Sequence, residues 1–303
     1  MSTVIAFSRY GEPDVLTQAQ AEVPVPGPGQ VLVRVRAVSV NPVDVKIRSG
    51  MMDGIMPVEF PVIPGWDVSG VVTASGDGAA AAVGDEVLGV AATGGYRDYA
   101  LLDRPVAKPA GLSWEAAAAM ITVGEAAFRV LKYLGLKPGQ TLVILGAGGS
   151  VGTVAVQLAV ARGITVIGIA AEDDTARISA LGAAGVRAGD GWADRVRAVA
   201  PDGVDAVFDT TGAGLLADAV DLAGGDPAKV ITIADHAAAA HGVRFTGADP
   251  SDRAPEALPE LAALMAAGKL TVPIWRTYPL AEAARAHADL EAGRNRGKVI
   301  LIP

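Results

Sequence analysis

The spacing of hydrophobic and polar positions changes near residue 115. Before that point, short valine-rich runs at residues 2–8, 30–40, 67–75 and 85–92 are separated by segments rich in Gly, Pro and Asp. Runs of this length and composition predict β-strands joined by turns. We therefore expect a compact β domain in the N-terminal part of the chain.

After residue 115, continuous apolar runs alternate with amphipathic ones. A helix is predicted within residues 111–140, where Pro138 and Gly139 stop it. Strands are predicted at 141–146, 164–170, 185–188, 204–211 and 229–234, with helical stretches between them. Apolar strands that alternate with amphipathic helices indicate a parallel sheet covered on both faces. This pattern predicts a doubly wound, nucleotide-binding α/β domain.

The C-terminal residues change texture again. Residues 269–275 predict a strand, 280–293 a helix and 297–303 a closing strand. We expect these elements to rejoin the N-terminal domain. Residues 1–115 and 270–303 would then form one domain, and residues 116–269 a second domain inserted into it.

Composition narrows the classes of function. The 303 residues include 51% hydrophobic ones, enough to build the cores of two domains. The net charge is -8 and no Lys/Arg cluster occurs, so no nucleic acid partner is expected. The absence of cysteine excludes disulfides and thiolate catalysis. No apolar run approaches the roughly 20 residues of a membrane span, and the N-terminus lacks a leader pattern, so we expect a cytoplasmic protein.

The stretch VILGAGGSVGTVAVQLA, residues 143–159, is the strongest motif. An apolar strand runs into a glycine-rich turn, and a helix is predicted to begin near Ser150. The free amides and positive dipole at such a helix start can hold a pyrophosphate, which side chains would obstruct. With the next strand about twenty residues on, this context predicts a dinucleotide site. Its candidate cofactor contacts are Gly146, Ala147, Gly149, Ser150, Val151 and Gly152.

The end of the second strand of this domain bears on the choice of cofactor. Ala170 and Ala171 are small enough to leave room for a 2'-phosphate, and Arg177 follows within reach of it. The carboxylates at residues 172–174 favour NADH instead, unless they complement the dipole of the next helix. We expect NADPH, with NADH left open.

Several ordered segments carry a wider resemblance. They are AVSVNPVDVKIRSG (37–50), PVIPGWDVSGVV (61–72), VGDEVLGV (83–90), GGYRDYALL (94–102), GAGGSVG (146–152), VDAVFDTTG (204–212) and RGKVIL (296–301). Together they resemble the zinc-independent quinone oxidoreductases of the medium-chain dehydrogenase/reductase superfamily. The resemblance implies a GroES-like β domain interrupted by a Rossmann domain. It also implies transfer of hydride from NADPH to a quinone or an α,β-unsaturated carbonyl, and a homodimer.

The same resemblance speaks against a zinc site. Zinc-dependent relatives have a cysteine where this chain has Asn41 and a histidine where it has Trp66. The three histidines, His236, His241 and His287, are not expected to replace these ligands, and His287 is expected on a solvent-facing helix. No metal site is therefore predicted.

Four residues are candidates for catalysis by resemblance. Asn41 and Tyr96 would donate hydrogen bonds to the oxygen that becomes negative as hydride arrives, Lys46 would supply a proton or a charge, and Thr122 matches a small hydroxyl position near the nicotinamide. Each has an alternative that the residues leave open. Asn41 can form the turn before Pro42, Lys46 can be solvated on a strand-to-helix connection, Tyr96 can serve packing, and Thr122 can line a helix.

Asp44 matches a family position but is expected to be structural, either by accepting backbone hydrogen bonds or by pairing with Arg48.

Further cofactor contacts follow from the resemblance and from the carboxyl edge of the predicted sheet, where open α/β sheets bind ligands. They are Thr210, Gly212, Ile233 and Ala234, together with Asn295, Arg296 and Lys298 near the C-terminus. The C-terminal three can equally form a β-turn with solvated charges.

Two departures from the family pattern keep alternatives open. Lys46 stands where many quinone reductases have tyrosine, and Asp174 where a lysine often binds the 2'-phosphate. Met51, Met52 and Met56 form either a flexible apolar wall for a lipophilic substrate or ordinary core filling. A second hypothesis is an NADPH-binding sensor, structural or tailoring protein without net redox turnover. A third, a methyltransferase, is disfavoured because the glycine turn follows a complete β domain.

Overall fold

The computed structural model describes residues 1–247, 249–293 and 295–303, and these form two compact units. Unit 1 comprises Met1–Thr122 and Leu258–Pro303, and unit 2 comprises Val123–Ala257. The chain passes between the units inside helix α2 (Trp114–Leu134) and at the start of helix α7 (Ala257–Ala266). The inserted domain expected from sequence, residues 116–269, extends beyond unit 2 at both ends. The reason is that the pattern of apolar residues changes near the start of α2 and the end of α7, whereas the units divide within or before these helices.

Unit 1 is built on an open sheet in the order β14-β15-β3-β4-β5-β7, with β6 paired to β3. Its strands are β3 (Val31–Val40), β4 (Asp67–Ser75), β5 (Glu86–Val90), β6 (Tyr99–Leu102), β7 (Val106–Ala107), β14 (Ile274–Pro279) and β15 (Lys298–Ile302). A separate ribbon pairs β1 (Ser2–Ala6) with β2 (Thr17–Ala21). The helical segments are η1 (Pro13–Val15), α1 (Pro42–Arg48), η5 (Leu280–Glu282) and α8 (Ala283–Glu291).

The register of β15 confirms that the C-terminal residues rejoin the N-terminal domain. β15 runs antiparallel to β3, with Val299 opposite Val40 and Leu301 opposite Val38. The strand predicted at 269–275 is wrong, because β14 covers Ile274–Pro279. Leu270 and Val272 are buried although they lie outside a strand, so their alternation reflects burial without ladder pairing.

Unit 2 is a parallel sheet in the order β10-β9-β8-β11-β12-β13. Its strands are β8 (Thr141–Leu145), β9 (Thr165–Ala170), β10 (Ala184–Arg187), β11 (Ala206–Asp209), β12 (Val230–Thr232) and β13 (Arg244–Phe245). The helical segments are α3 (Ser150–Ala161), α4 (Glu172–Ala180), α5 (Trp192–Val199), α6 (Leu216–Leu222), η2 (Pro227–Lys229), η3 (Ala238–His241) and η4 (Pro250–Asp252). This is the doubly wound order, with its switch point between β8 and β11.

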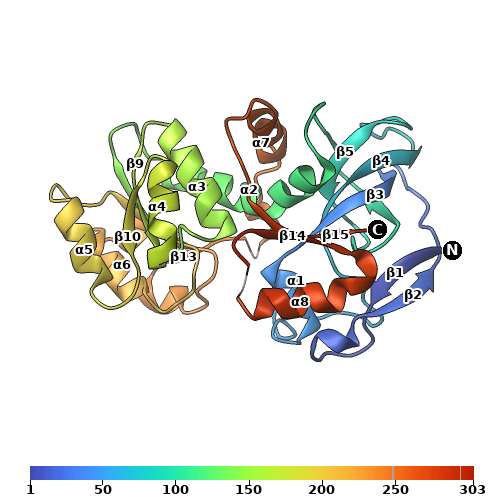
Figure 1. Cartoon of the computed structure of the whole chain (residues 1–303), viewed down its shortest axis with the longest axis horizontal. Helices are drawn as coiled ribbons and strands as arrows, with labels where there is room; N and C mark the ends of the chain where they lie inside the picture. The colour runs from blue at the N-terminus through green and yellow to red at the C-terminus, as the bar shows by residue number, and fades with distance from the viewer. Residues whose placement is uncertain (248, 294) are drawn as a thin grey trace. The chain divides into compact units, whose positions relative to one another are not determined.

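Both faces of the unit 2 sheet are covered. Val143 and Leu145 pack in one cluster with Trp192 of α5 and Leu216 of α6. Leu142, on the opposite face of the same strand, is also fully buried. Figure 1 shows α3 and α4 on the other side of the sheet from α5 and α6. Double burial explains why these strands are apolar throughout instead of alternating.

Among the described residues, no helix combines the length and apolar character that crossing a bilayer requires.

Candidate functional site

The glycine turn joins β8 to α3 at the switch point of the unit 2 sheet. Gly146 has φ +81°, and its amide donates to the Ile169 carbonyl at 3.0 Å. Gly149 is the N-cap of α3 in extended conformation, without a capping side chain. The first amides of α3 therefore have neither an intrahelical partner nor a side-chain acceptor from the N-cap. They form a donor set suited to an anion.

The turn is packed so closely that it requires glycine. A Cβ on Gly152 would lie 2.3 Å from the Gly146 carbonyl oxygen and 2.6 Å from the Ala147 Cα. A Cβ on Gly146 would lie 2.5 Å from Thr210 Oγ1. Gly149 is less crowded, at 3.3 Å from the Gly146 oxygen. The residues present thus fit a dinucleotide pyrophosphate: backbone amides lie at a helix start, and the glycines of the turn add no side chains of their own.

Arg177 and Asp174 of α4 lie against this turn. The Arg177 guanidinium donates to the Gly148 carbonyl at 2.7 Å and to Thr153 Oγ1 at 3.1 Å. It also pairs with Asp174 Oδ1 at 3.2 Å. The N-cap of α4 is Ala171, whose side chain makes no capping hydrogen bond. Asp174 pairs with Arg177, and Arg177 is oriented toward the glycine turn.

Ala170 is buried at the end of β9, and Ala171 is exposed just after it.

The carboxyl ends of β11 and β12 are joined by a buried carboxylate that sequence reasoning did not select. Asp209 accepts hydrogen bonds from Thr232 Oγ1 at 2.7 Å, Thr211 Oγ1 at 2.7 Å and the Gly212 amide at 3.3 Å. Thr210 Oγ1 donates to the Leu145 carbonyl at 2.7 Å, which ties β11 to β8. In the sequence, Asp209 could be noticed only as an aspartate that follows the apolar run 204–208. Strand-terminal aspartates are common in loops, so the sequence did not single it out.

Gly212 follows this junction with φ +63°, and a Cβ there would lie 2.6 Å from the Ala234 carbonyl oxygen. Ile233 donates its amide to the Asp209 carbonyl at 3.2 Å. The four residues predicted at this edge, Thr210, Gly212, Ile233 and Ala234, thus lie together.

Unit 1 contains a second cluster, centred on Asn41, which caps α1. Asn41 Nδ2 donates to Asp67 Oδ2 at 2.8 Å, and Lys298 Nζ donates to Asn41 Oδ1 at 2.5 Å. Thr122 Oγ1 donates to the other oxygen of Asp67 at 2.6 Å. Asn41, Asp67 and Lys298 are almost completely buried. Burial lowers the pKa of Lys298 and raises that of Asp67, while their mutual attraction opposes both shifts.

This cluster changes the interpretation of three predicted residues. One N–H of Asn41 and its oxygen are committed to partners inside unit 1, as is the Thr122 hydroxyl. The Lys298 ammonium, proposed from sequence for the cofactor, is bonded to Asn41 and to the Val40 carbonyl. In unit 1 these side chains therefore bind one another, and the roles predicted for them stay predictions.

Tyr96 is fully buried, and its hydroxyl lies 2.9 Å from His287 Nε2. The expectation that His287 faces solvent is wrong, because α8 turns this residue into the core of unit 1. Burial lowers the pKa of His287 to about 3, and the neighbouring Arg48 adds to the effect. Burial also raises the pKa of Tyr96 well above its usual value. Gly65 makes room for the ring, since a Cβ there would lie 2.3 Å from it.

Asp44 is buried beside these groups. Its Oδ2 accepts a hydrogen bond from the Asn41 backbone amide at 2.8 Å, which is one of the two structural roles predicted for it. The other, a pair with Arg48, is wrong because Arg48 binds Glu291 of α8. Burial raises the pKa of Asp44 to about 7.

Lys46 lies on α1, and not on a connection before it, and is partly buried. No hydrogen bond or ion pair joins its ammonium to any other residue in the described ranges. Asn295 forms a local turn by donating to the Gly297 carbonyl at 3.0 Å, and Arg296 is exposed.

Within residues 1–247, 249–293 and 295–303, no group of three or more His, Cys, Asp or Glu side chains is arranged to hold a metal ion. His236 stacks on Phe245, with ring centroids 5.4 Å apart.

Comparisons with known proteins agree with this arrangement. The family model described as Alcohol dehydrogenase GroES-like domain matches residues 27–110, and that described as Zinc-binding dehydrogenase matches residues 181–301. A quinone oxidoreductase of Sus scrofa is 32% identical, over 100% of this chain and 98% of that protein. A 2-methylene-furan-3-one reductase of Solanum lycopersicum is 29% identical, over 98% of this chain and 78% of that protein.

Among solved structures, Escherichia coli quinone oxidoreductase complexed with NADPH matches with a TM-score of 0.88 and 25% identity, over 99% of this chain and 100% of that one. The relatives and the two-unit fold lead to one conclusion. The chain is an oxidoreductase that belongs to the quinone oxidoreductase family of the medium-chain dehydrogenase/reductase superfamily.

Proposed function

We propose that this protein, without zinc, transfers hydride from NADPH to a quinone or to an α,β-unsaturated carbonyl. The observation that carries the proposal is the glycine cradle at the switch point of the unit 2 sheet, where a Cβ on Gly152 would overlap the turn. The names of the relatives, quinone oxidoreductase and 2-methylene-furan-3-one reductase, support the two acceptor classes.

The cofactor would be held by the glycine turn and the strand ends of unit 2. The amides at Ser150, Val151 and Gly152 would receive the pyrophosphate. Arg177 is the cation proposed for a 2'-phosphate, because it already lies at the turn. Its pairing with Asp174 opposes this role, since a phosphate would have to compete with that carboxylate. Because Arg177 nevertheless lies at the turn, NADPH is proposed as the preferred cofactor. A titration that compares NADPH with NADH tests this preference.

The bound cofactor supplies the hydride, and the protein must stabilise the negative charge that develops on the acceptor oxygen. Lys46 is the proposed donor to that oxygen, because its ammonium has no partner among the described residues and can turn toward a ligand. Asn41 and Thr122 are proposed to hold the local backbone through Asp67. Tyr96 is proposed to support α1 and α8 through His287.

The activity test mixes the protein with NADPH and a panel of quinones and enones while the absorbance of reduced nicotinamide is followed. At least one acceptor should cause consumption of NADPH, and a parallel titration should show tighter binding of NADPH than of NADH. A Gly152→Val variant should lose cofactor binding because of the clash. If NADPH binds tightly and no acceptor turns over, the protein is a nucleotide-binding sensor or structural member of the family instead.

A Lys46→Met variant tests the proposed donor. Removal of one donor to a developing oxyanion should lower kcat by roughly 100-fold, with little change in the Kd for NADPH. Lys137→Met, which removes an exposed lysine of unit 2, is the matched control and should retain wild-type kcat. An unchanged kcat in Lys46→Met would show that the oxyanion is stabilised elsewhere.

The proposal also includes a homodimer, which sedimentation equilibrium of the purified protein tests directly.

A further inference from the structure

A surface cavity of about 400 Å³ lies in unit 1, and none of the residues that line it is proposed to bind the cofactor or the acceptor. Its polar and aromatic lining comes from β3, from the start of β6 with the residue before it, and from the first turn of α2: Arg34, Arg36, Asp98, Tyr99, Trp114 and Glu115. The volume is in the range of small-molecule sites. Both arginines are exposed, so a ligand can reach the cavity from solvent.

Strand β3 carries a β-bulge at this cavity. The register of β3 with β4 steps over Arg36, since Val35 pairs with Gly70 and the next pair is Ala37 with Ser69. A bulge redirects a side chain of its strand and is common beside functional sites. Arg36 and the arginine two residues before it both line the cavity.

The two guanidinium groups have no partner among the residues that the structure describes. No hydrogen bond, ion pair or ring contact involves the side chain of Arg34 or Arg36. The two carboxylates of the cavity are compensated elsewhere. Asp98 Oδ2 accepts the Thr3 amide at 2.7 Å, and Glu115 lies in the first turn of α2, where the helix dipole favours a negative charge. The arginines can therefore accept one further negative charge from a ligand.

The aromatic wall of the cavity is held in place from behind. Lys108 Nζ lies 4.6 Å from the centroid of the Trp114 ring and donates to the Leu112 carbonyl at 2.7 Å. Ser69 Oγ donates to the Trp114 carbonyl at 2.7 Å. Tyr99, held in strand β6, lines the cavity as well. Aromatic side chains fixed in this way offer a surface on which a flat ring can stack.

We propose that this cavity binds a flat aromatic molecule that carries a single carboxylate. The carboxylate pairs with Arg34 and Arg36, whose fork-shaped donors match its two oxygens. The ring lies against Trp114 and Tyr99. A phosphomonoester, with about two negative charges at pH 7, is disfavoured because two carboxylates also line the cavity. Arg36 lies about 16 Å along the strand from Asn41, so the site is separate from the Asn41 cluster.

Titrations of the full chain with naphthalene carboxylate, followed by NMR of the ligand, test the site. Three related probes separate the contributions. Naphthalene carboxamide keeps the ring without the charge, decalin carboxylate keeps the charge without a flat ring, and naphthyl phosphate carries about two charges. Naphthalene carboxylate should bind with a Kd below about 1 mM, and each related probe at least about 5-fold more weakly. An excess of NADPH should leave the Kd of naphthalene carboxylate unchanged.

The double variant Arg34→Gln with Arg36→Gln should weaken binding of naphthalene carboxylate about 10-fold or more, because both charged donors are lost. The matched control, Arg9→Gln with Arg104→Gln, removes two exposed arginines of unit 1 that do not line the cavity and whose side chains likewise have no partner within the described ranges. It should bind the probe as wild type does. Lys46→Met should also bind it unchanged, because Lys46 belongs to the proposed acceptor site.

The absence of saturable binding up to about 10 mM naphthalene carboxylate would overturn the proposal. Equal affinity for the carboxamide or the decalin probe, or tighter binding of naphthyl phosphate, would show that the assigned chemistry is wrong. An equal loss in the control double variant, a loss in Lys46→Met or displacement by NADPH would place the probe outside this cavity and also overturn it. The test does not depend on the proposed function, since it requires neither cofactor binding nor turnover.

Discussion

At the scale of single residues, burial shifts the pKa values of two groups of unit 1 in opposite directions. Asp44 has a pKa of about 7 against an ordinary value of 3.8, because burial disfavours its charged form. As pH rises from about 4 to 7, the unfolded chain releases this proton and the folded chain keeps it, so stability falls. His287 has a pKa of about 3 against 6.5. Stability from this group is complete above pH 6.5 and falls as pH drops toward 3.

Asp44→Asn should therefore uncover the slope of His287. The variant keeps an oxygen for the Asn41 amide, and its free energy of unfolding should rise from pH 4.5 to 6.5, relative to a flatter wild-type profile. At pH 8 the variant no longer carries the cost of the buried Asp44 charge. This raises its free energy of unfolding relative to wild type by at most about 4 kcal/mol. Urea unfolding at several pH values measures this difference. The exposed carboxyl of Asp14 supplies the control, Asp14→Asn. Parallel profiles for wild type and Asp44→Asn would contradict the assignment.

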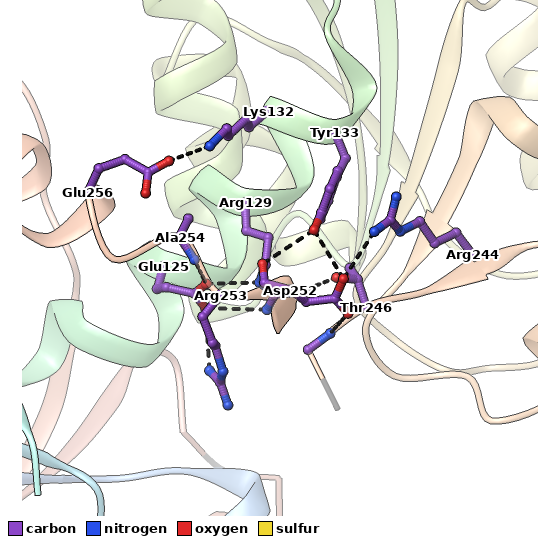
Figure 2. Close-up of polar contacts among 11 residues, drawn as sticks. Glu125, Arg129, Lys132, Tyr133, Arg244, Thr246, Asp252, Arg253, Ala254 and Glu256 are labelled. Atoms are coloured by element: carbon purple, nitrogen blue, oxygen red, sulfur yellow. Dashed lines mark hydrogen bonds and ion pairs between the residues drawn. The ribbon is translucent and has the colours of Figure 1, made fainter. Parts of the chain in front are cut away.

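At the scale of elements, helix α2 is anchored to the segment that follows β13 by a buried ion pair (Figure 2). Glu125 binds Arg129 Nε at 2.9 Å and the Ala254 amide at 2.9 Å. Arg129 also donates to Thr246 Oγ1 at 2.7 Å. Both charged residues are buried, so these bonds join sequence positions 117 and 129 residues apart without solvent screening. The outer pair of Lys132 and Glu256 is exposed.

Arg129→Met should lower the free energy of unfolding by about 3–5 kcal/mol, because Glu125 is left buried with too few donors. The double variant Arg129→Met with Glu125→Gln should recover part of this loss, since the buried charge that Arg129 compensated is gone and only the partly exposed Arg253 had remained beside it. Lys132→Met should behave like wild type, because its pair with Glu256 is solvated. Equilibrium denaturation of the four proteins measures these effects. A similar loss in Lys132→Met would show that position on α2, not burial, governs the anchor.

At the scale of the whole molecule, the chain builds two units from three segments, and the proposed cofactor contacts around the glycine turn lie in unit 2. A ligand that binds only the folded state stabilises it by mass action. The amides of the glycine turn should gain the most protection, because the pyrophosphate would occupy their donors.

NADPH at about 100 times its Kd should stabilise the fold against local and global opening of unit 2 by about 2.7 kcal/mol. Thermal unfolding should shift upward with NADPH concentration, and hydrogen exchange should slow at residues 146–153 more than in the β1–β2 ribbon of unit 1. Gly152→Val should abolish both effects. A shift confined to unit 1 would place the cofactor elsewhere.

Much of this organisation was predictable because local physics determines it. The parallel strands of unit 2 are apolar throughout since both faces are buried, and the glycine turn has its spacing because a Cβ on Gly146 or Gly152 would clash within the turn. The inserted arrangement followed from the change of texture near residue 115 and its reversal near the C-terminus.

By itself, then, the sequence determined the nature of the two units and the alternation of strands and helices in unit 2, and it predicts the place of a pyrophosphate cradle, since each rests on periodicity or spacing within a few residues. Only the tertiary structure decided which polar side chains are free. Asn41 meets Lys298 across 257 residues, and Tyr96 meets His287 across 191. Such partners are set by strand pairing and helix packing, on which local patterns carry no information. The same packing left Asp235 Oδ2 buried without a partner among the described residues.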